Sequence, residues 1–227
     1  MSFENITVQP NLFSRVIIRL VLASVVLGGV FFLSAGTTSY WEAWVYLTVL
    51  LLPALGMSIY LLKHSPELLE RRLKIGEKEV EQKTIIKLAS LLFILVLVLP
   101  GLDQRFGWST VSISVVFFAD ILAFMGYGFV SLVFRENQVA SRTIQVETNQ
   151  KVISTGPYAL VRHPMYLGVL VLYLATPLAL GSHWGLIPTM LLVAVLAARI
   201  LNEEKVLLKE LDGYELYTEK VNRRLIP

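Results

Sequence analysis

The chain has 227 residues, of which 55% are hydrophobic and only 16% are charged. Soluble domains carry about 25% charged residues, so this composition excludes an ordinary soluble domain and is typical of a membrane protein. The net charge of +3 is small and spread over the loops, which favours contact with anionic lipid over a nucleic-acid surface. The chain contains no cysteine, which excludes disulfides, thiolate catalysis and cysteine-ligated zinc.

Four apolar segments are long enough to cross a bilayer, whose core takes about 20 helical residues. They are residues 12–33, 43–62, 85–102 and 111–134. Two further apolar stretches follow, 166–180 and 186–201, and the first is short for a full crossing. They favour a helical hairpin that dips through the membrane and returns. The predicted fold class is therefore an all-α integral membrane protein with four full transmembrane helices, a C-terminal helical hairpin and a cytoplasmic tail helix.

Basic residues in the loops predict the orientation. The 63–87 loop holds seven lysines and arginines, whereas the 34–42 loop holds none and the 103–110 loop holds only Arg105. Cytoplasmic loops are enriched in basic residues, so both termini, the 63–87 loop and the 135–165 segment are expected in the cytoplasm.

Polar residues gather at the start of the predicted hairpin, where ionisable side chains are costly and are functional candidates by default. Pro164 suits the first turn of a helix, so Arg162 and His163 stand just before it, near backbone N–H groups that favour an anion. Gly168 permits a close approach to that first part of the helix. The alternative is that Arg162 and His163 only snorkel to the membrane interface.

A second polar group follows the last apolar run. Arg199 and Glu203 are four residues apart and can pair on one helical face, whereas Glu204 is turned away by about 100°. At least one carboxylate is expected in a partly dehydrated cleft, the alternative being a solvated helix end. Tyr214 and Tyr217 either close this cleft or anchor the tail.

Asp120 lies in the middle of the fourth predicted span. An intramembrane acid is a functional candidate by default, but a helix-packing hydrogen bond accounts for it equally well. It is therefore not assigned to the site.

The order of the polar residues resembles that of the isoprenylcysteine carboxyl methyltransferase family, and membrane phospholipid methyltransferases share the C-terminal pattern. The similar positions are Gly156-Pro157-Tyr158, Val161-Arg162-His163-Pro164-Met165-Tyr166, Gly168, Arg199-Ile200, Glu203-Glu204, Leu207, Tyr214 and Tyr217. The similarity covers about residues 135–227, including Asn137 and Ser141, and is only topological over 1–134. The tail departs from the family: where members often have arginine before Val-Pro, this chain has Lys220-Val221-Asn222, followed by Arg223-Arg224.

The resemblance implies a membrane enzyme that uses S-adenosyl-L-methionine without a Rossmann domain, and no Gly-x-Gly-x-x-Gly motif follows a strand in this sequence. We expect a single domain, 1–227. Within it the resemblance implies a four-helix scaffold (1–134) and a cofactor-binding, catalytic part (135–227). The implied cofactor-binding residues are Tyr158, His163, Pro164, Tyr166, Gly168, Glu203, Glu204 and Tyr217. The implied catalytic residues are Arg162, Arg199, Glu203 and Arg223, and no metal is expected.

The residue types suit this chemistry but leave the methyl acceptor open. A carboxylate acceptor is ionised at neutral pH and needs cations such as Arg162 and Arg199, whereas an amine acceptor needs a base, for which Glu203 and Glu204 are the candidates. We expect a carboxylate on a lipophilic or prenylated partner that arrives from the membrane. A phospholipid amine and a small thiol are the alternatives.

Two more distant functions also fit part of the pattern. Sterol-type reductases carry a similar Arg-His-Pro-x-Tyr-x-Gly segment and use NADPH, but they are usually larger and a 2′-phosphate pocket needs more clustered arginines. A non-catalytic lipid-binding membrane protein is the other alternative, although none of the matched positions is missing from this chain.

The predicted orientation can be tested with single introduced cysteines. A cysteine at Ser39 or Ser109 is expected to react with an impermeant maleimide from outside, and one at Glu77 or Glu147 is expected to be protected, because basic loops stay in the cytoplasm. The reverse labelling pattern would place the polar cluster on the wrong face for an intracellular cofactor.

Overall fold

The computed structural model describes residues 11–73, 80–137 and 151–226, and every regular element within them is a helix. Ser141, Glu77 and Glu147, named above, lie outside the described residues. The long helices are α1 (Leu12–Ala35), α2 (Trp41–His64), α4 (Val80–Phe106), α5 (Ile113–Glu136), α6 (Pro164–Ala179) and α7 (Leu186–Glu210). The short ones are α3 (Pro66–Leu73), the 3-10 helix η1 (Gly156–Ala159) and α8 (Tyr214–Lys220). The predicted all-α fold is confirmed.

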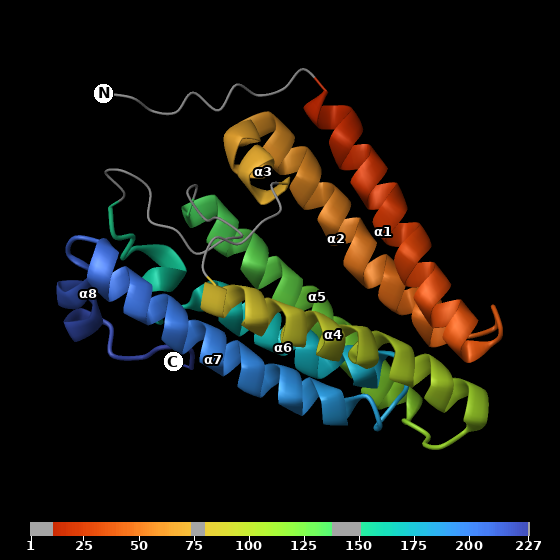
Figure 1. The fold of residues 1–227 in the computed structure, drawn as a ribbon. Coiled ribbons are helices and arrows are strands. Elements are labelled where there is room, and N and C mark those ends of the chain that lie inside the picture. Colours follow the sequence, from red (N-terminus) through yellow and green to blue (C-terminus); the bar gives the residue numbers. More distant parts are fainter. Residues whose placement is uncertain (1–10, 74–79, 138–150, 227) are drawn as a thin grey trace.

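The long helices form antiparallel neighbours, so their connections alternate between the two ends of the bundle. The turns between α1 and α2, α4 and α5, and α6 and α7 lie at one end, while α3, η1 and α8 lie at the other (Figure 1). We call these the turn end and the α8 end. The residues that the sequence singles out before α6 and late in α7 therefore share one end of the molecule.

Five helices in the described part of the chain are long and apolar enough to cross a membrane: α1, α2, residues 84–106 of α4, α5 and α7. The sequence predicted the first four as full spans and placed residues 186–201 in a hairpin. The fifth span arises because α7 continues without a break from Leu186 to Glu210, beyond the apolar stretch 186–201. The remaining apolar helix, α6, has 16 residues and is short, as expected.

Asp103 fixes the turn of the α6–α7 hairpin to the rest of the turn end. Its buried carboxylate accepts hydrogen bonds from Ser109 N at 2.7 Å, from Ser109 Oγ at 2.6 Å and from Ser182 Oγ at 2.6 Å. A buried charged group is tolerated when its lone pairs are satisfied in this way. The α6–α7 turn is thus tied to the α4–α5 turn through Asp103.

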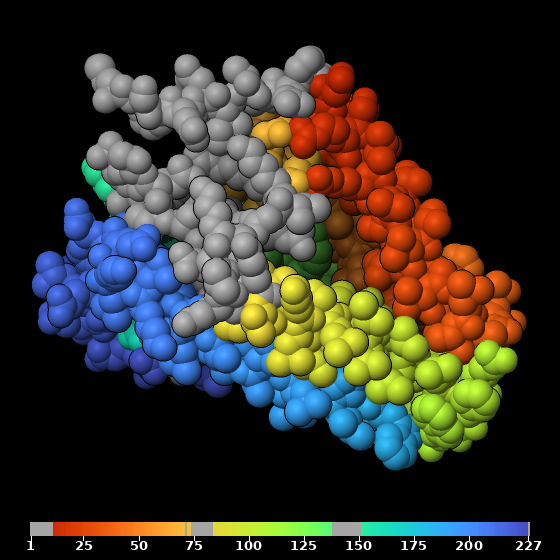
Figure 2. Space-filling view, in the orientation of Figure 1, coloured from red at the N-terminus to blue at the C-terminus, as the bar shows by residue number. Residues whose placement is uncertain are grey.

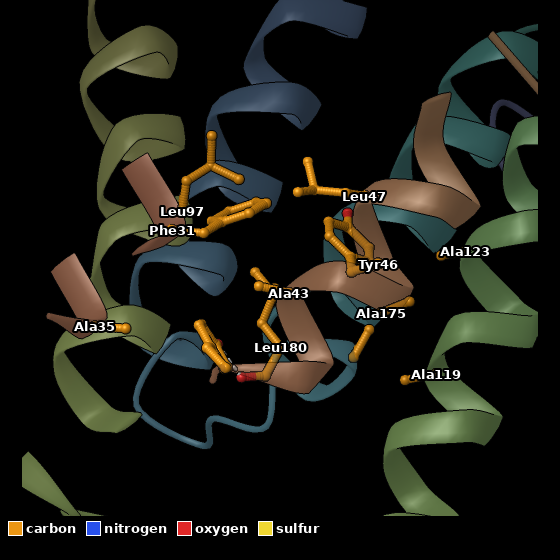
Figure 3. Close-up of a cluster of buried hydrophobic side chains, with 12 residues drawn as sticks. Phe31, Ala35, Ala43, Tyr46, Leu47, Leu97, Ala119, Ala123, Ala175 and Leu180 are labelled. Carbon is orange, nitrogen blue, oxygen red and sulfur yellow. Dashed lines mark hydrogen bonds between the residues drawn. The ribbon is translucent and has the colours of Figure 1, made fainter. Parts of the chain in front are cut away.

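The core near the turn end is built from both halves of the chain. Phe31 of α1, Tyr46 of α2 and Leu97 of α4 pack together, while Ala123 of α5 and Ala175 of α6 are small enough to let their helices approach α2 (Figure 3). Many large apolar side chains outside this core are exposed, as a surface that faces lipid requires.

Asp120 of α5 is buried near this core. Neither of its carboxylate oxygens has a hydrogen-bond partner among the described residues. The helix-packing hydrogen bond that the sequence allowed for is therefore not made to the described part of the chain.

Helices α1 and α4 diverge from the turn end. Gly101 of α4 packs so closely on α1 that an added Cβ would lie 1.8 Å from Ser34 Oγ. Farther along, Figure 2 shows a hollow between the two helices with parts of α2 and α5 at its floor. The scaffold is thus close-packed where Gly101 meets α1 and hollowed farther along these two helices.

Two glycines set the crossing of α5 and α6, the most extensive helix pair in the described structure. A Cβ added to Gly126 would lie 2.9 Å from the carbonyl oxygen of Gly168, and one added to Gly168 would lie 2.6 Å from Val130 Cγ2. Close backbone approach through small residues is a common way for membrane helices to pack. The close approach that Gly168 was expected to permit is thus made by α5.

We predict that Gly126→Ala lowers the thermal stability of the detergent-solubilised protein. The added methyl group meets backbone rather than a movable side chain, so the cost is expected to be about 1–3 kcal/mol. Gly128→Ala is the matched control, because nothing lies within 4 Å of a Cβ at Gly128 on the same helix. Equal unfolding temperatures for the two variants would contradict this account of the crossing.

Candidate active site

Three segments meet at the α8 end: the residues before α6, the second half of α7 and the C-terminal tail. The tail runs back beside the segment before α6, where Arg162 N donates to Arg223 O and His163 N donates to Arg224 O, both at 2.9 Å. These backbone hydrogen bonds hold the C-terminal tail, which is more than fifty residues away in the sequence, beside the start of α6.

Glu204 of α7 lies at the centre of this junction. Its Oε1 accepts a hydrogen bond from Arg162 Nε at 2.7 Å and lies 3.3 Å from His163 Nε2, while its Oε2 accepts one from Arg224 Nε at 2.7 Å. The Glu204 side chain is only 7% exposed. A carboxylate this buried is stable only when paired, and each of its oxygens is paired with an arginine.

Arg162 holds the tail as well as Glu204. Its side chain is 7% exposed, and Nη1 donates to the carbonyl oxygens of Val221 at 2.9 Å and Asn222 at 3.1 Å. The position predicted to orient an acceptor carboxylate is therefore also a structural clamp between α7 and the tail.

A second network involves Glu203, the residue next to Glu204 in α7. The Tyr166 hydroxyl donates to Glu203 Oε2 at 2.5 Å and accepts a hydrogen bond from Arg199 Nε at 3.0 Å. Arg199 and Glu203, which the sequence expected to pair across one helical turn, are thus linked through the first turn of α6. Glu203 is half-buried, so it is more accessible than Glu204.

The tyrosines of η1 and α8 close the junction from the side. Tyr217 donates its hydroxyl to the carbonyl oxygen of Tyr158 at 2.7 Å, and Asn137 Nδ2 donates to the Tyr158 hydroxyl at 2.8 Å. Burial raises the pKa of Tyr217 to about 12, so its phenol stays protonated and remains a donor. Of the two roles that the sequence allowed, Tyr217 makes the contact that anchors the tail.

Tyr214 contributes a polar atom that the sequence did not assign to the site. Its side chain is buried, and its hydroxyl has no hydrogen-bond partner in the described part of the chain. Burial is the main cause that raises the pKa of Tyr214, and the negative charge of the nearby Glu204 carboxylate raises it further. A buried hydroxyl beside charged groups normally finds a partner, so a Tyr214 hydroxyl without one among the described residues is unusual.

The other predicted site residues lie at the edge of these networks. Pro164 begins α6 and is buried, as a proline in the first turn of a helix can be. Gly168 faces α5. The Arg223 side chain is exposed, whereas the adjacent Arg224, which the sequence did not select, reaches Glu204. Nothing in the sequence distinguishes two consecutive arginines in a tail without regular structure.

The residues brought together suit an amphiphilic cofactor with several hydrogen-bonding groups. Glu203 can accept from hydroxyl or amino groups, the Tyr214 hydroxyl has no partner among the described residues, and Tyr158 and Tyr166 offer aromatic rings. Among the described residues no cluster of three or more His, Asp or Glu could hold a metal ion.

We predict that Glu204→Gln destabilises the protein far more than Glu210→Gln does. The first substitution removes the buried charge that pairs with Arg162 and Arg224, which is expected to cost about 3 kcal/mol. Glu210 is exposed at the end of α7 and serves as the control. Thermal unfolding in one detergent measures both, and equal midpoints would show that Glu204 does not hold the tail.

Comparison with known proteins finds a match over this part of the chain. A family model described as phospholipid methyltransferase matches residues 114–212, which run from α5 to the residues just before α8 and make up less than half of the chain. The match includes Arg162, Glu203 and Glu204 but neither the tail nor α1–α4. No curated protein matches the chain. The family match and the five apolar helices together support a membrane-embedded methyltransferase that acts on lipid-type substrates.

Proposed function

We propose that the chain is an S-adenosylmethionine-dependent methyltransferase of the isoprenylcysteine carboxyl methyltransferase type. It would methylate a carboxylate on a lipophilic acceptor at the cytoplasmic face of a membrane. The observation that carries this proposal is the pairing of two polar networks, one around Glu204 and one around Glu203, at the end of an apolar bundle. Both glutamates lie within the region that matches the methyltransferase family model.

The groups of the cofactor have counterparts among the described residues. Glu203 is the more accessible carboxylate and would accept hydrogen bonds from the ribose hydroxyls or the amino group. The rings of Tyr158 and Tyr166 would line the adenine or approach the sulfonium, because aromatic faces attract cations. The Tyr214 hydroxyl, which has no partner among the described residues, is a further donor or acceptor. When bound, the cofactor would supply an electrophilic methyl group.

The role of the protein in such a transfer is to position the reactants and exclude water. In-line methyl transfer gains most from the orientation of its two partners. Arg162 and Glu204 fix the tail, and Tyr166 is held between Arg199 and Glu203, so the groups around the site are held in place before a ligand arrives. Groups fixed in advance do not have to reorganise during the reaction.

A carboxylate acceptor is favoured by the balance of charges. Among the described residues the two networks hold three guanidiniums and two carboxylates, and guanidiniums stabilise a nearby anionic group. The lipophilic part of the acceptor would approach through the hollow between α1 and α4 (Figure 2), which opens at the side of the bundle.

A phospholipid amine is the second candidate, favoured by the description of the matching family model. An amine must lose a proton before or during methylation, so a base is needed. Glu203 would be that base, because Glu204 is held by cations on both of its oxygens.

The proposal is tested by methyl transfer from labelled cofactor to N-acetyl-farnesylcysteine and to an extract of membrane lipids. A base-labile product that releases volatile methanol is expected, because a methyl ester hydrolyses in base. A base-stable label would indicate N- or S-methylation. The methyl acceptor would then be an amine or a thiol, and the carboxylate proposal would be wrong.

Glu203→Gln tests the cofactor site separately from the acceptor. Calorimetry is expected to show that the wild-type protein binds S-adenosylhomocysteine and that the variant, still folded, binds it at least about tenfold more weakly, because a charged acceptor of hydrogen bonds is lost. Glu210→Gln is the control. A folded wild-type protein that binds dinucleotides and no S-adenosylhomocysteine would overturn the assignment.

A further inference from the structure

Among the described residues, the two polar networks bring together three guanidiniums and two carboxylates. Arg162, Arg199 and Arg224 are linked by hydrogen bonds to Glu203 and Glu204, directly or through Tyr166. A guanidinium that stays partly exposed at the edge of a buried cluster is a site where an anion gains free energy, because nearby opposite charge offsets the loss of water.

The three guanidiniums differ in how far they remain accessible. Arg162 is 7% exposed and has its Nε and Nη1 atoms committed to Glu204 and to the tail. Arg199 donates to the Tyr166 hydroxyl inside the second network. The Arg224 side chain is 56% exposed although its Nε is bound to Glu204.

Arg224 is also held in place before any ligand arrives. Its backbone carbonyl accepts the hydrogen bond from His163 N at 2.9 Å, and its Nε is 2.7 Å from Glu204 Oε2. Neither of its terminal nitrogens has a hydrogen-bond partner among the described residues. Its outer edge therefore presents N–H groups in the planar fork that suits a carboxylate or a phosphate.

We propose that Arg224 is an oxyanion-recognition residue, with Glu204 as its positioning residue and its terminal nitrogens as the binding edge. The inference rests on the proposed function and deepens it by naming the cation that meets the anionic group of a ligand. It assigns this role to Arg224 rather than to Arg223, whose exposed side chain has no anchoring contact to the described residues.

The oxyanion has two possible sources in a methyl transfer of this kind. One is the methionyl carboxylate of the cofactor, and the other is the carboxylate or phosphate of the acceptor. The two sources are distinguished by ligands that carry or lack the group. S-adenosylhomocysteine has the cofactor carboxylate, its decarboxylated analogue does not, and N-acetyl-farnesylcysteine carries an acceptor carboxylate.

The test compares Arg224→Gln with Lys209→Gln, which removes one exposed positive charge near the end of α7. If the cofactor supplies the oxyanion, Arg224→Gln weakens S-adenosylhomocysteine binding about tenfold or more and leaves the decarboxylated analogue unaffected. If the acceptor supplies it, cofactor affinity is kept and KM for N-acetyl-farnesylcysteine rises about tenfold with a smaller change in kcat. Either result supports the proposal.

Arg224→Lys controls for the case in which Arg224→Gln loses binding only because it does not fold. Lysine keeps a cation beside Glu204 but loses the fork, so the variant is expected to unfold near the wild-type temperature and to bind the same ligand more weakly. If both Arg224 variants match Lys209→Gln in every measurement, or if only Arg223→Gln produces the loss, the proposal is overturned.

Thermal stabilisation by inorganic sulfate tests the oxyanion site independently of the proposed methyltransferase activity. Sulfate is expected to raise the unfolding temperature of the wild-type protein more than that of Arg224→Gln, because ligands that bind the folded state stabilise it. If the wild-type protein binds no S-adenosylhomocysteine but shows this difference, the methyltransferase assignment fails and the oxyanion site stands. If sulfate stabilises both proteins equally and no ligand distinguishes them, the oxyanion site fails.

Discussion

The burial of the Glu204 carboxylate is the constraint on which the arrangement of the α8 end depends. A charge in that position must be paired, and the available partners come from two other segments of the chain, Arg162 and His163 before α6 and Arg224 in the tail. Satisfying one carboxylate therefore brings three segments together. The backbone bonds from Arg162 and His163 to the tail add to this junction.

The hairpin of α6 and α7 is held at its turn and along α6, and these contacts set the position of the site along the bundle. At the turn end the buried Asp103 binds Ser182, and along its length α6 rests on α5 through Gly126 and Gly168. With these contacts set, the first turn of α6 has little freedom to move along the bundle. Tyr166 in that turn consequently meets Arg199 and Glu203 of α7.

Hydropathy and motif spacing predicted the all-helical membrane fold and the region of the polar cluster, because both depend on local patterns. That α7 is long enough for a fifth span was not predicted, since hydropathy assigned only residues 186–201 to its apolar part. The choice between Arg223 and Arg224 depends on the path of the tail, which is set by long-range bonds to Arg162 and His163. The role of Gly168 in the contact with α5 likewise requires the position of Gly126, forty-two residues away.

The most direct test of the account is a cryo-EM structure of the protein in lipid nanodiscs with S-adenosylhomocysteine bound. The account predicts ligand density beside Tyr166 and Glu203 at the α8 end, within reach of the outer edge of Arg224, and an intact Glu204 junction. Density at the turn end near Asp103, or a ligand-bound structure in which Arg162 and Arg224 have left Glu204, would contradict it.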